Sequence, residues 1–109
     1  NYAWYQVNGD SRTHPVASLK PNDLGLFDMQ GNVFEWGNDV FAAYPSGSKD
    51  VVDAPKTDAV TDSFARVARG GSFGNPASLH RSALRDVIVP SVQIVNLGFR
   101  PARTYNLSR

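Results

Sequence analysis

The sequence contains no cysteine, so its 109 residues hold no disulfide, no thiolate metal site and no catalytic thiol. It also lacks an excess of charge, because 11 basic and 10 acidic residues give a formal net charge of +1. That balance leaves no broad electrostatic surface for nucleic acid or for anionic membrane. No apolar run approaches the roughly 20 residues of a membrane-spanning helix. We therefore expect no nucleic-acid partner and no membrane-spanning segment.

Short apolar runs separated by turn-forming residues are what the sequence does contain. Hydrophobic residues make up 41% of it, which fits one small globular domain. Strands are predicted at 33–36, 64–73 and 97–103, where the residues are β-branched or aromatic or alternate with period two. Residues 44–63 predict a long surface loop, and residues 77–86 a short helix or irregular coil. The pattern indicates a loop-rich fold that carries its function on loops supported by a small sheet.

Two carboxylates flank a Gly-Asn turn in the stretch "DMQGNVFEW". Asp28 and Glu35 can converge only if the chain reverses between them, and Gly31 permits such a reversal. Backbone carbonyls in the turn would add oxygen ligands, which together suit a hard cation such as Ca²⁺. The alternative is an ordinary β-turn with two solvated acids, and the residues alone leave both interpretations open.

A second unusual stretch is "RSALRDVIVPSVQIVNLGFR", residues 81–100, in which valines and isoleucines are interrupted by Pro90. Residues 84–95 could form two buried strands joined at Pro90. They could also form an exposed apolar surface that contacts a partner.

Several motifs in a fixed order resemble one known family. "THPV", "PNDLGLFDMQGNVFEWGNDVF", "RVARGGSF", "RSALR" and "NLGFRPAR" are similar to segments of the formylglycine-generating-enzyme/sulfatase-modifying-factor domain family. The resemblance implies an α+β, C-type lectin-type fold, loop-rich with short antiparallel strands. It also implies that residues 1–109 are the C-terminal portion of one such domain, whose N-terminal part is missing or lies on a separate chain and acts as a partner.

The same resemblance implies a structural calcium site and the absence of copper. Its calcium ligands carry over as the Asp28 side chain, the Gly31 and Val33 carbonyls and the Glu35 carboxylate. Catalytic members use two cysteines after the "GGS" motif to bind copper, and the corresponding "GGSFGNPASLHRS" has none. His14 and His80 are too few for a multi-histidine iron site. We expect no catalytic residue in this chain.

One branch of the family consists of the variable proteins of diversity-generating retroelements, and the chain resembles this branch most. In those proteins the segment between "RGGS" and "GFR" is randomised at adenines, and the favoured codons cannot yield Lys, Glu, Gln, Met or Trp. Of these excluded types, residues 74–96 contain only Gln93. Asn75 and Asn96 are then diversified sites that were left at, or returned to, the template residue. The expected diversified, ligand-binding positions are Gly74, Pro76, Leu79, His80, Leu84, Asp86, Val87, Ile88, Val89, Ser91, Val92, Ile94 and Val95.

Three functions are compatible with this resemblance. The first is a receptor or display protein that presents a variable surface, with its valines and isoleucines facing outward, to a protein or cell-surface ligand; an extracellular or cell-surface location follows by analogy. The alternative is a non-thiol enzyme subunit of the sulfatase-modifying or ergothioneine-synthase type, with its metal site on the missing N-terminal part. A structural module that binds no ligand is the third. Arg81, Arg85 and Arg100 are expected to be scaffold arginines in each case.

Overall fold

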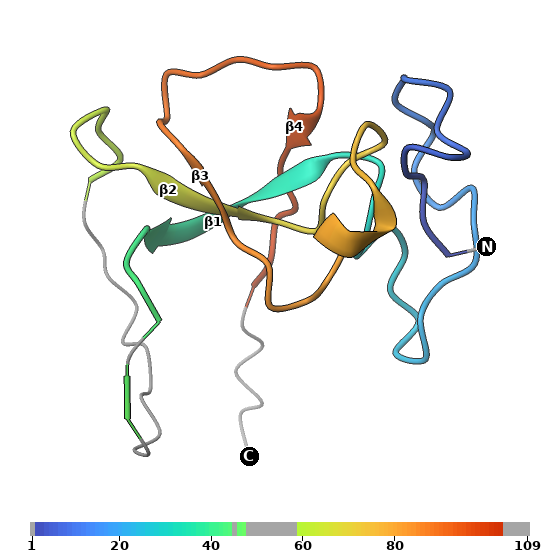
Figure 1. The fold of residues 1–109 in the computed structure, drawn as a ribbon, viewed down its shortest axis with the longest axis horizontal. Helices are drawn as coiled ribbons and strands as arrows, with labels where there is room; N and C mark the ends of the chain where they lie inside the picture. The colour runs from blue at the N-terminus through green and yellow to red at the C-terminus, as the bar shows by residue number, and fades with distance from the viewer. Residues whose placement is uncertain (1, 45, 48–58, 104–109) are drawn as a thin grey trace.

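A four-stranded mixed sheet forms the centre of the molecule (Figure 1). The computed structural model describes residues 2–44, 46–47 and 59–103. Along the chain the strands are β1 (Phe34–Val40), β2 (Arg66–Arg69), β3 (Asp86–Ile88) and β4 (Leu97–Gly98), arranged in the order β3-β2-β1-β4. The described residues contain one helical segment, the 3-10 helix η1 (Ala77–Leu79).

The strand pairings are antiparallel except at one edge. β1 pairs with β2, and β2 with β3, in antiparallel register, as the sequence predicts. β4 instead lies parallel to β1. Parallel neighbours cannot be joined by a tight hairpin and need a longer connection. The segment between β3 and β4 is the last part of the connection from β1 to β4, and Figure 1 shows it arching away from the sheet. The expectation of antiparallel strands is therefore wrong for this one pairing.

One face of the sheet carries the hydrophobic core. Directly paired residues share a face, so the pairings Phe34 with Leu97, and Trp36 with Ala68, place these four side chains together. Phe34, Ala68 and Ile88 are buried there, and Trp36, Val92 and Leu97 pack against them. Val87 points to the opposite face because successive side chains of a strand alternate.

The Gly-Asn turn joins the N-terminal segment to this sheet. Gly31 has φ of +87°, and a Cβ at this position would collide with the carbonyl oxygen of Trp4, so only glycine fits. The backbone N–H of Asn32 donates to Trp4 O at 2.8 Å, while the N–H of Phe73 donates to Asn32 O at 2.8 Å. The Asn32 side chain bonds both backbone groups of His14, at 3.0 Å each. The turn is thus a structural junction of three segments.

The strands are shorter than the sequence predicts, except for β1. The predicted strand at 33–36 extends to Val40, whereas the strand within 64–73 is limited to Arg66–Arg69. Residues 77–86 form η1 followed by turns, which agrees with a short helix or coil. Most of the loop predicted at 44–63 lies outside the described residues. The described residues contain no helix long and apolar enough to cross a membrane.

Candidate functional site

Of the two carboxylates in the "DMQGNVFEW" stretch, that of Glu35 is bonded by a guanidinium group. Arg100 donates from Nε to both carboxylate oxygens of Glu35, at 3.0 and 2.9 Å, and from a terminal nitrogen to one of them at 2.6 Å. The same nitrogen donates to Phe27 O at 2.9 Å. Hydrogen bonding to Glu35 raises the pKa of Arg100, with partial burial opposing and the charges of Glu35 and Asp28 adding to the rise. Asp28 therefore lies near enough to act on the same cation.

The oxygen ligands expected for calcium are thus partly engaged by protein groups. One carboxylate oxygen of Asp28 accepts the N–H of Ala17 at 2.7 Å, and Glu35 accepts the three bonds from Arg100. The donor set of two carboxylates and the Gly31 and Val33 carbonyls still fits a hard cation by type, and a carboxylate pair offers more acceptor sites than these bonds use. Calcium binding at this place stays a prediction. A bound calcium ion would share the Glu35 carboxylate with the Arg100 guanidinium.

Most of the expected diversified positions lie at the surface. Val95 is 83% exposed, and Val87, Val89 and Ile94 are exposed large hydrophobic residues. Three further positions are half-buried, namely Leu79, Leu84 and Val92. The remaining exposed positions are Gly74, Pro76, Asp86 and Ser91. The region 86–95 therefore carries an exposed apolar surface along β3 and the arching segment after it.

Two of the expected positions are buried, and the outward display expected for the valines and isoleucines is wrong for Ile88. Ile88 is 8% exposed and belongs to the core, because its pairing opposite Arg66 turns its side chain toward Phe34 and Ala68. His80 is also 8% exposed; its Nδ1 lies 3.1 Å from Pro76 O, and its ring meets Tyr5 edge to face. Val92 packs against the core as well, so the apolar run divides between the core and the surface.

The two sites that carry the template residue, Asn75 and Asn96, both bond Ser72. Asn75 Oδ1 accepts the N–H and the hydroxyl of Ser72, at 3.0 and 2.6 Å. Asn96 donates its amide to Ser72 Oγ at 3.3 Å, and its carbonyl accepts the N–H of Phe34 at 2.8 Å. These bonds give both asparagines a structural role that the sequence alone does not indicate. An asparagine beside a "GGS" turn is the signal that could have suggested it.

The arginines expected in the scaffold differ in how they are held. Arg85 donates to Ala42 O at 2.7 Å, and its guanidinium lies 3.7 Å from the ring centroid of Tyr44. Arg100 is held by Glu35, as described above. Arg81 is exposed and donates only to Ser78 O, at 3.1 Å, within its own turn. The scaffold role therefore agrees with the contacts of Arg85 and Arg100, whereas Arg81 faces solvent.

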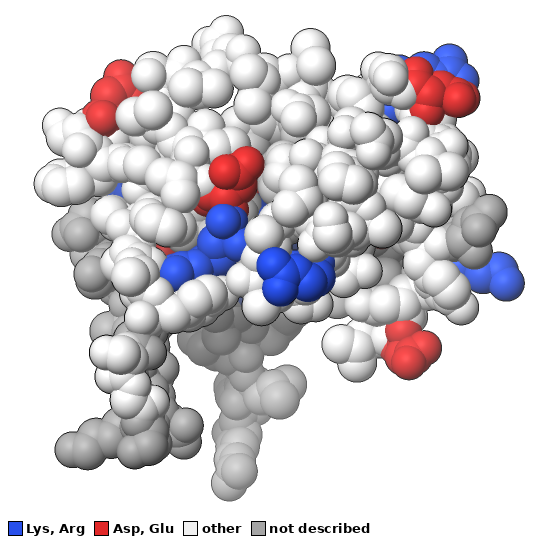
Figure 2. All heavy atoms as spheres, viewed as in Figure 1, with Lys and Arg blue, Asp and Glu red and all other residues white. Residues whose placement is uncertain are grey.

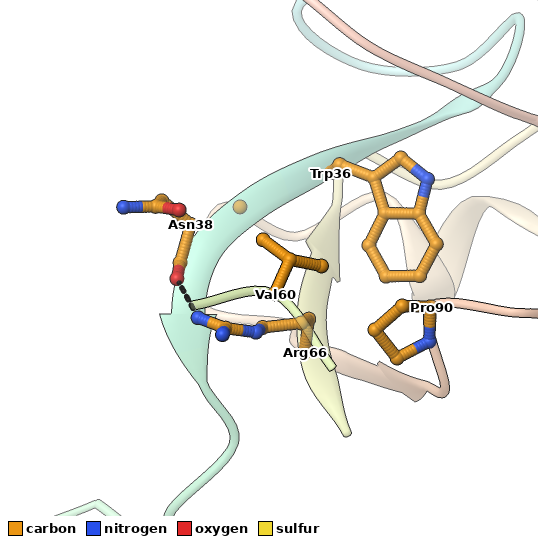
Figure 3. A pocket seen from close by; sticks show the side chains of 6 residues that line it. Trp36, Asn38, Val60, Arg66 and Pro90 are labelled. Carbon is orange, nitrogen blue, oxygen red and sulfur yellow. Dashed lines mark hydrogen bonds between the residues drawn. The ribbon is translucent and has the colours of Figure 1, made fainter. Parts of the chain in front are cut away.

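A pocket of about 320 Å³ lies between β1, β2 and Pro90 (Figure 3). Trp36 and Pro90 form one side, and Figure 3 shows Arg66 extending toward Asn38 on the other. Arg66 is buried and donates to Asn38 O at 2.6 Å and to Ala59 O at 3.0 Å. The guanidinium is thus engaged by backbone carbonyls, which makes it a structural group that connects β1 to the segment before β2.

Comparisons with known proteins agree with this arrangement. The sequence model of the Sulfatase-modifying factor enzyme 1-like domain matches residues 1–105. A formylglycine-generating enzyme of Streptomyces coelicolor is 37% identical over 106 residues, which are 93% of this chain and 32% of that protein. A formylglycine-generating enzyme of Mus musculus is 34% identical over 98 residues, 87% of this chain and 25% of that protein.

Among solved structures, Treponema denticola variable protein 1 superposes with a TM-score of 0.78 at 40% identity, over 91% of this chain and 34% of that protein. The match confirms the loop-rich α+β, C-type lectin-type fold and the resemblance to variable proteins of the Treponema type. The chain spans about a third or less of the relatives it matches.

Proposed function

The chain belongs to the sulfatase-modifying factor enzyme 1-like domain family, and on that premise we propose that it is a ligand-binding display module. Its segment 74–96 presents diversified residues on a constant lectin-type scaffold to a protein or cell-surface ligand. The likeness to a solved variable protein, at 40% identity, supports this role rather than catalysis.

One observation carries the proposal: the side chains of residues 74–96 differ in whether they make hydrogen bonds that hold the segment to the rest of the chain. Arg85, a position expected to be constant, makes a long-range side-chain hydrogen bond to Ala42 O, and the two sites that carry the template residue, Asn75 and Asn96, bond Ser72. Among the thirteen expected diversified positions, only His80 and Asp86 make side-chain hydrogen bonds to described residues, and both bonds are local. Side chains that anchor nothing can be exchanged at little cost in stability.

The exposed apolar residues of this region form the proposed contact surface. Val87, Val89, Ile94 and Val95 are all exposed, and exposed apolar side chains that lie close together in sequence commonly mark protein-binding sites. A protein ligand is therefore supported over a polar small molecule.

The decisive experiment is genomic. We expect a reverse transcriptase gene near this coding sequence, together with a near-copy of the 74–96 segment that differs from it at adenines. A locus with neither would contradict the proposal.

The N-terminal part of the same domain is the proposed partner of this chain. The described residues expose Val7, Val16, Leu24 and Phe99 almost fully, although each is large and hydrophobic. The matched relatives are about three times as long or longer, which supplies enough chain to cover such residues. The N-terminal part, supplied on the same chain or as a separate chain, should raise the melting temperature above that of residues 1–109 alone. An unchanged melting temperature with both forms would contradict this partner.

An enzyme subunit is the second candidate, because the matched curated proteins include formylglycine-generating enzymes. This chain has no cysteine, so the thiol chemistry of the catalytic members would have to come from elsewhere. Metal analysis of the full-length protein separates the two roles. Stoichiometric copper or iron with oxygen consumption would favour the enzyme. For the display role we expect neither, and we expect an extracellular or cell-surface location, which protease treatment of intact cells would test.

A further inference from the structure

A second groove, of about 330 Å³, lies apart from the exposed apolar surface of residues 86–95. One wall consists of Tyr2 and residues from 22 to 30, and the other consists of residues 69–70 and 80–82. Two segments distant in sequence therefore face each other across it. We call it the 22–30/80–82 groove.

Two arginines give one wall of this groove a positive charge. Arg69 donates one N–H to Ser82 O at 3.0 Å, and Arg81 donates one to Ser78 O at 3.1 Å. These bonds position both side chains and leave their other N–H groups available. The carboxylates of the described residues that form ion pairs are those of Asp10 and Glu35, and neither pairs with these arginines. Figure 2 shows basic side chains near the centre of one face, with an acidic side chain directly beside one of them.

His80 also lines this groove, but its ring is buried. Its Nδ1 lies 3.1 Å from Pro76 O, which can only accept, so Nδ1 carries the proton. Its buried Nε2 has no hydrogen-bond partner among the described residues. Buried polar nitrogens are rarely left unpaired in folded proteins. Because this nitrogen is buried against Gly71, it offers no contact to a ligand in the groove, and the arginines remain the polar contacts.

The opposite wall is apolar, with one acid. Leu26 and Met29 are exposed, and Tyr2 lies beside them on this wall. Asp28 also lines it, and one of its carboxylate oxygens is bonded to Ala17 N–H. A ligand for this groove thus needs an anionic group for the arginines and an apolar group for Leu26 and Met29. Asp28 would repel a ligand whose negative charge fills the whole groove.

We propose that the 22–30/80–82 groove binds an acidic peptide segment, with a carboxylate on Arg69 and Arg81 and an apolar side chain on Leu26 and Met29. A planar carboxylate matches the fork of a guanidinium, which gives a directed contact. A nucleic acid is disfavoured because the net charge is only +1 and its phosphates would meet Asp28. The inference goes beyond the display role, since neither arginine belongs to the diversified positions.

The test uses the full chain and two synthetic peptides of alternating residues, one of Glu and Leu and one of Gln and Leu. Titration calorimetry should show that the Glu peptide binds at least tenfold more tightly than the Gln peptide. Arg81→Gln should weaken binding of the Glu peptide at least fivefold. Arg81→Lys should weaken it less, because the charge remains while the fork is lost. Equal binding of the two peptides, or no effect of Arg81→Gln, would overturn the proposal.

Two controls separate this site from general charge effects and from loss of the fold. Arg12→Gln removes the charge of an exposed arginine that does not line the groove, and it should leave binding of the Glu peptide unchanged. Arg81 makes only a local bond, so Arg81→Gln should keep the melting temperature of the wild type. Inorganic phosphate should compete weakly, because it offers no apolar group. Phosphate that binds more tightly than the Glu peptide would contradict an acidic-peptide ligand.

Discussion

Arg100 and Glu35 are 65 residues apart in sequence, yet their side chains are joined by three hydrogen bonds. The parallel register of β4 on β1 places Gly98 opposite Glu35. Arg100 follows two residues later, so its side chain emerges on the same face as Glu35 and reaches it. The ion pair therefore depends on the edge pairing, and it fastens the chain after β4 to β1.

Replacing this arginine should measure what the pair contributes. In Arg100→Lys the bidentate geometry is lost while the charge remains. Because the two side chains are 37% and 22% exposed, solvent screening limits the loss to about 1 kcal/mol, or a fall of about 4–8 °C in melting temperature. Arg12→Lys is the matched control, since Arg12 pairs with Asp10 at 3.8 Å and is exposed. Equal falls in the two variants would show that the Glu35 pair adds nothing.

The pH dependence of the pair follows from its charge. Glu35 raises the pKa of Arg100 in the folded state. The stabilising contribution of Arg100 is therefore complete below the ordinary arginine pKa, and it is lost only as the pH rises through the raised pKa. Titration of Arg100 should therefore leave the melting temperature unchanged from neutral to moderately alkaline pH. A fall in this range that Arg100→Gln abolishes would show that the contribution of Arg100 is lost below the ordinary arginine pKa, and would contradict this prediction.

Calcium, if it binds at Asp28, Gly31, Val33 and Glu35, should stabilise the fold by mass action. Calcium at 100 times its dissociation constant adds about 2.7 kcal/mol, so a chelator should lower the melting temperature. Glu35→Gln removes one ligand charge and should abolish the response to the chelator. Asp86→Asn alters a carboxylate outside the expected site and should keep it. An unchanged melting temperature of the wild-type chain after chelation would exclude a structural ion.

Two glycines with positive φ provide a matched test of the Gly-Asn junction. Gly25 (φ +76°) has open space where a Cβ would be, whereas at Gly31 (φ +87°) the Cβ would collide with Trp4. Gly25→Ala should cost only the left-handed strain, about 1–2 kcal/mol. Gly31→Ala should cost about 2–5 kcal/mol, because displacement of the Trp4 backbone is added. Chemical denaturation would measure both, and equal costs would show that the Trp4 contact is not important.

Substitutions in the apolar run should separate core from surface. Ile88→Ser removes a buried side chain and leaves a hydroxyl in its place, which should cost at least about 2–5 kcal/mol of the free energy of unfolding. Val95→Ser, at a side chain that is 83% exposed, should change it by less than about 0.5 kcal/mol. Urea denaturation distinguishes these outcomes. A tolerated Ile88→Ser would instead support diversification at that position.

The local patterns predicted several elements correctly, for identifiable reasons. Residues 64–73 alternate with period two, which predicts a strand, and β2 forms within them, with Val67 and Ala68 buried on its two faces. The Gly-Asn turn predicted a chain reversal between Asp28 and Glu35, and Arg100 does bond both Glu35 and the carbonyl of Phe27, the residue before Asp28. The ordered motifs predicted the fold, which the likeness to a solved structure confirms.

The run "VIVP" shows that a local pattern does not predict which of its residues are buried. Val87, Ile88 and Val89 are similar in size and hydrophobicity, so composition cannot tell which of them is buried. Pairing of β3 with β2 decides it, because the register sets Ile88 opposite Arg66 and turns it toward the core. The same register turns Val87 to the other face, where it is exposed.

The sequence by itself determined the absence of thiol chemistry, the turn at Gly31 and the family motifs, because these depend on residue identity and local conformation. Only the tertiary structure decided that Arg100 shares Glu35, that Ile88 lies in the core and that Arg69 and Arg81 line one groove. Each of these requires segments distant in sequence to meet in one register. Such contacts are set by strand pairing and the chain connections, which no local pattern specifies.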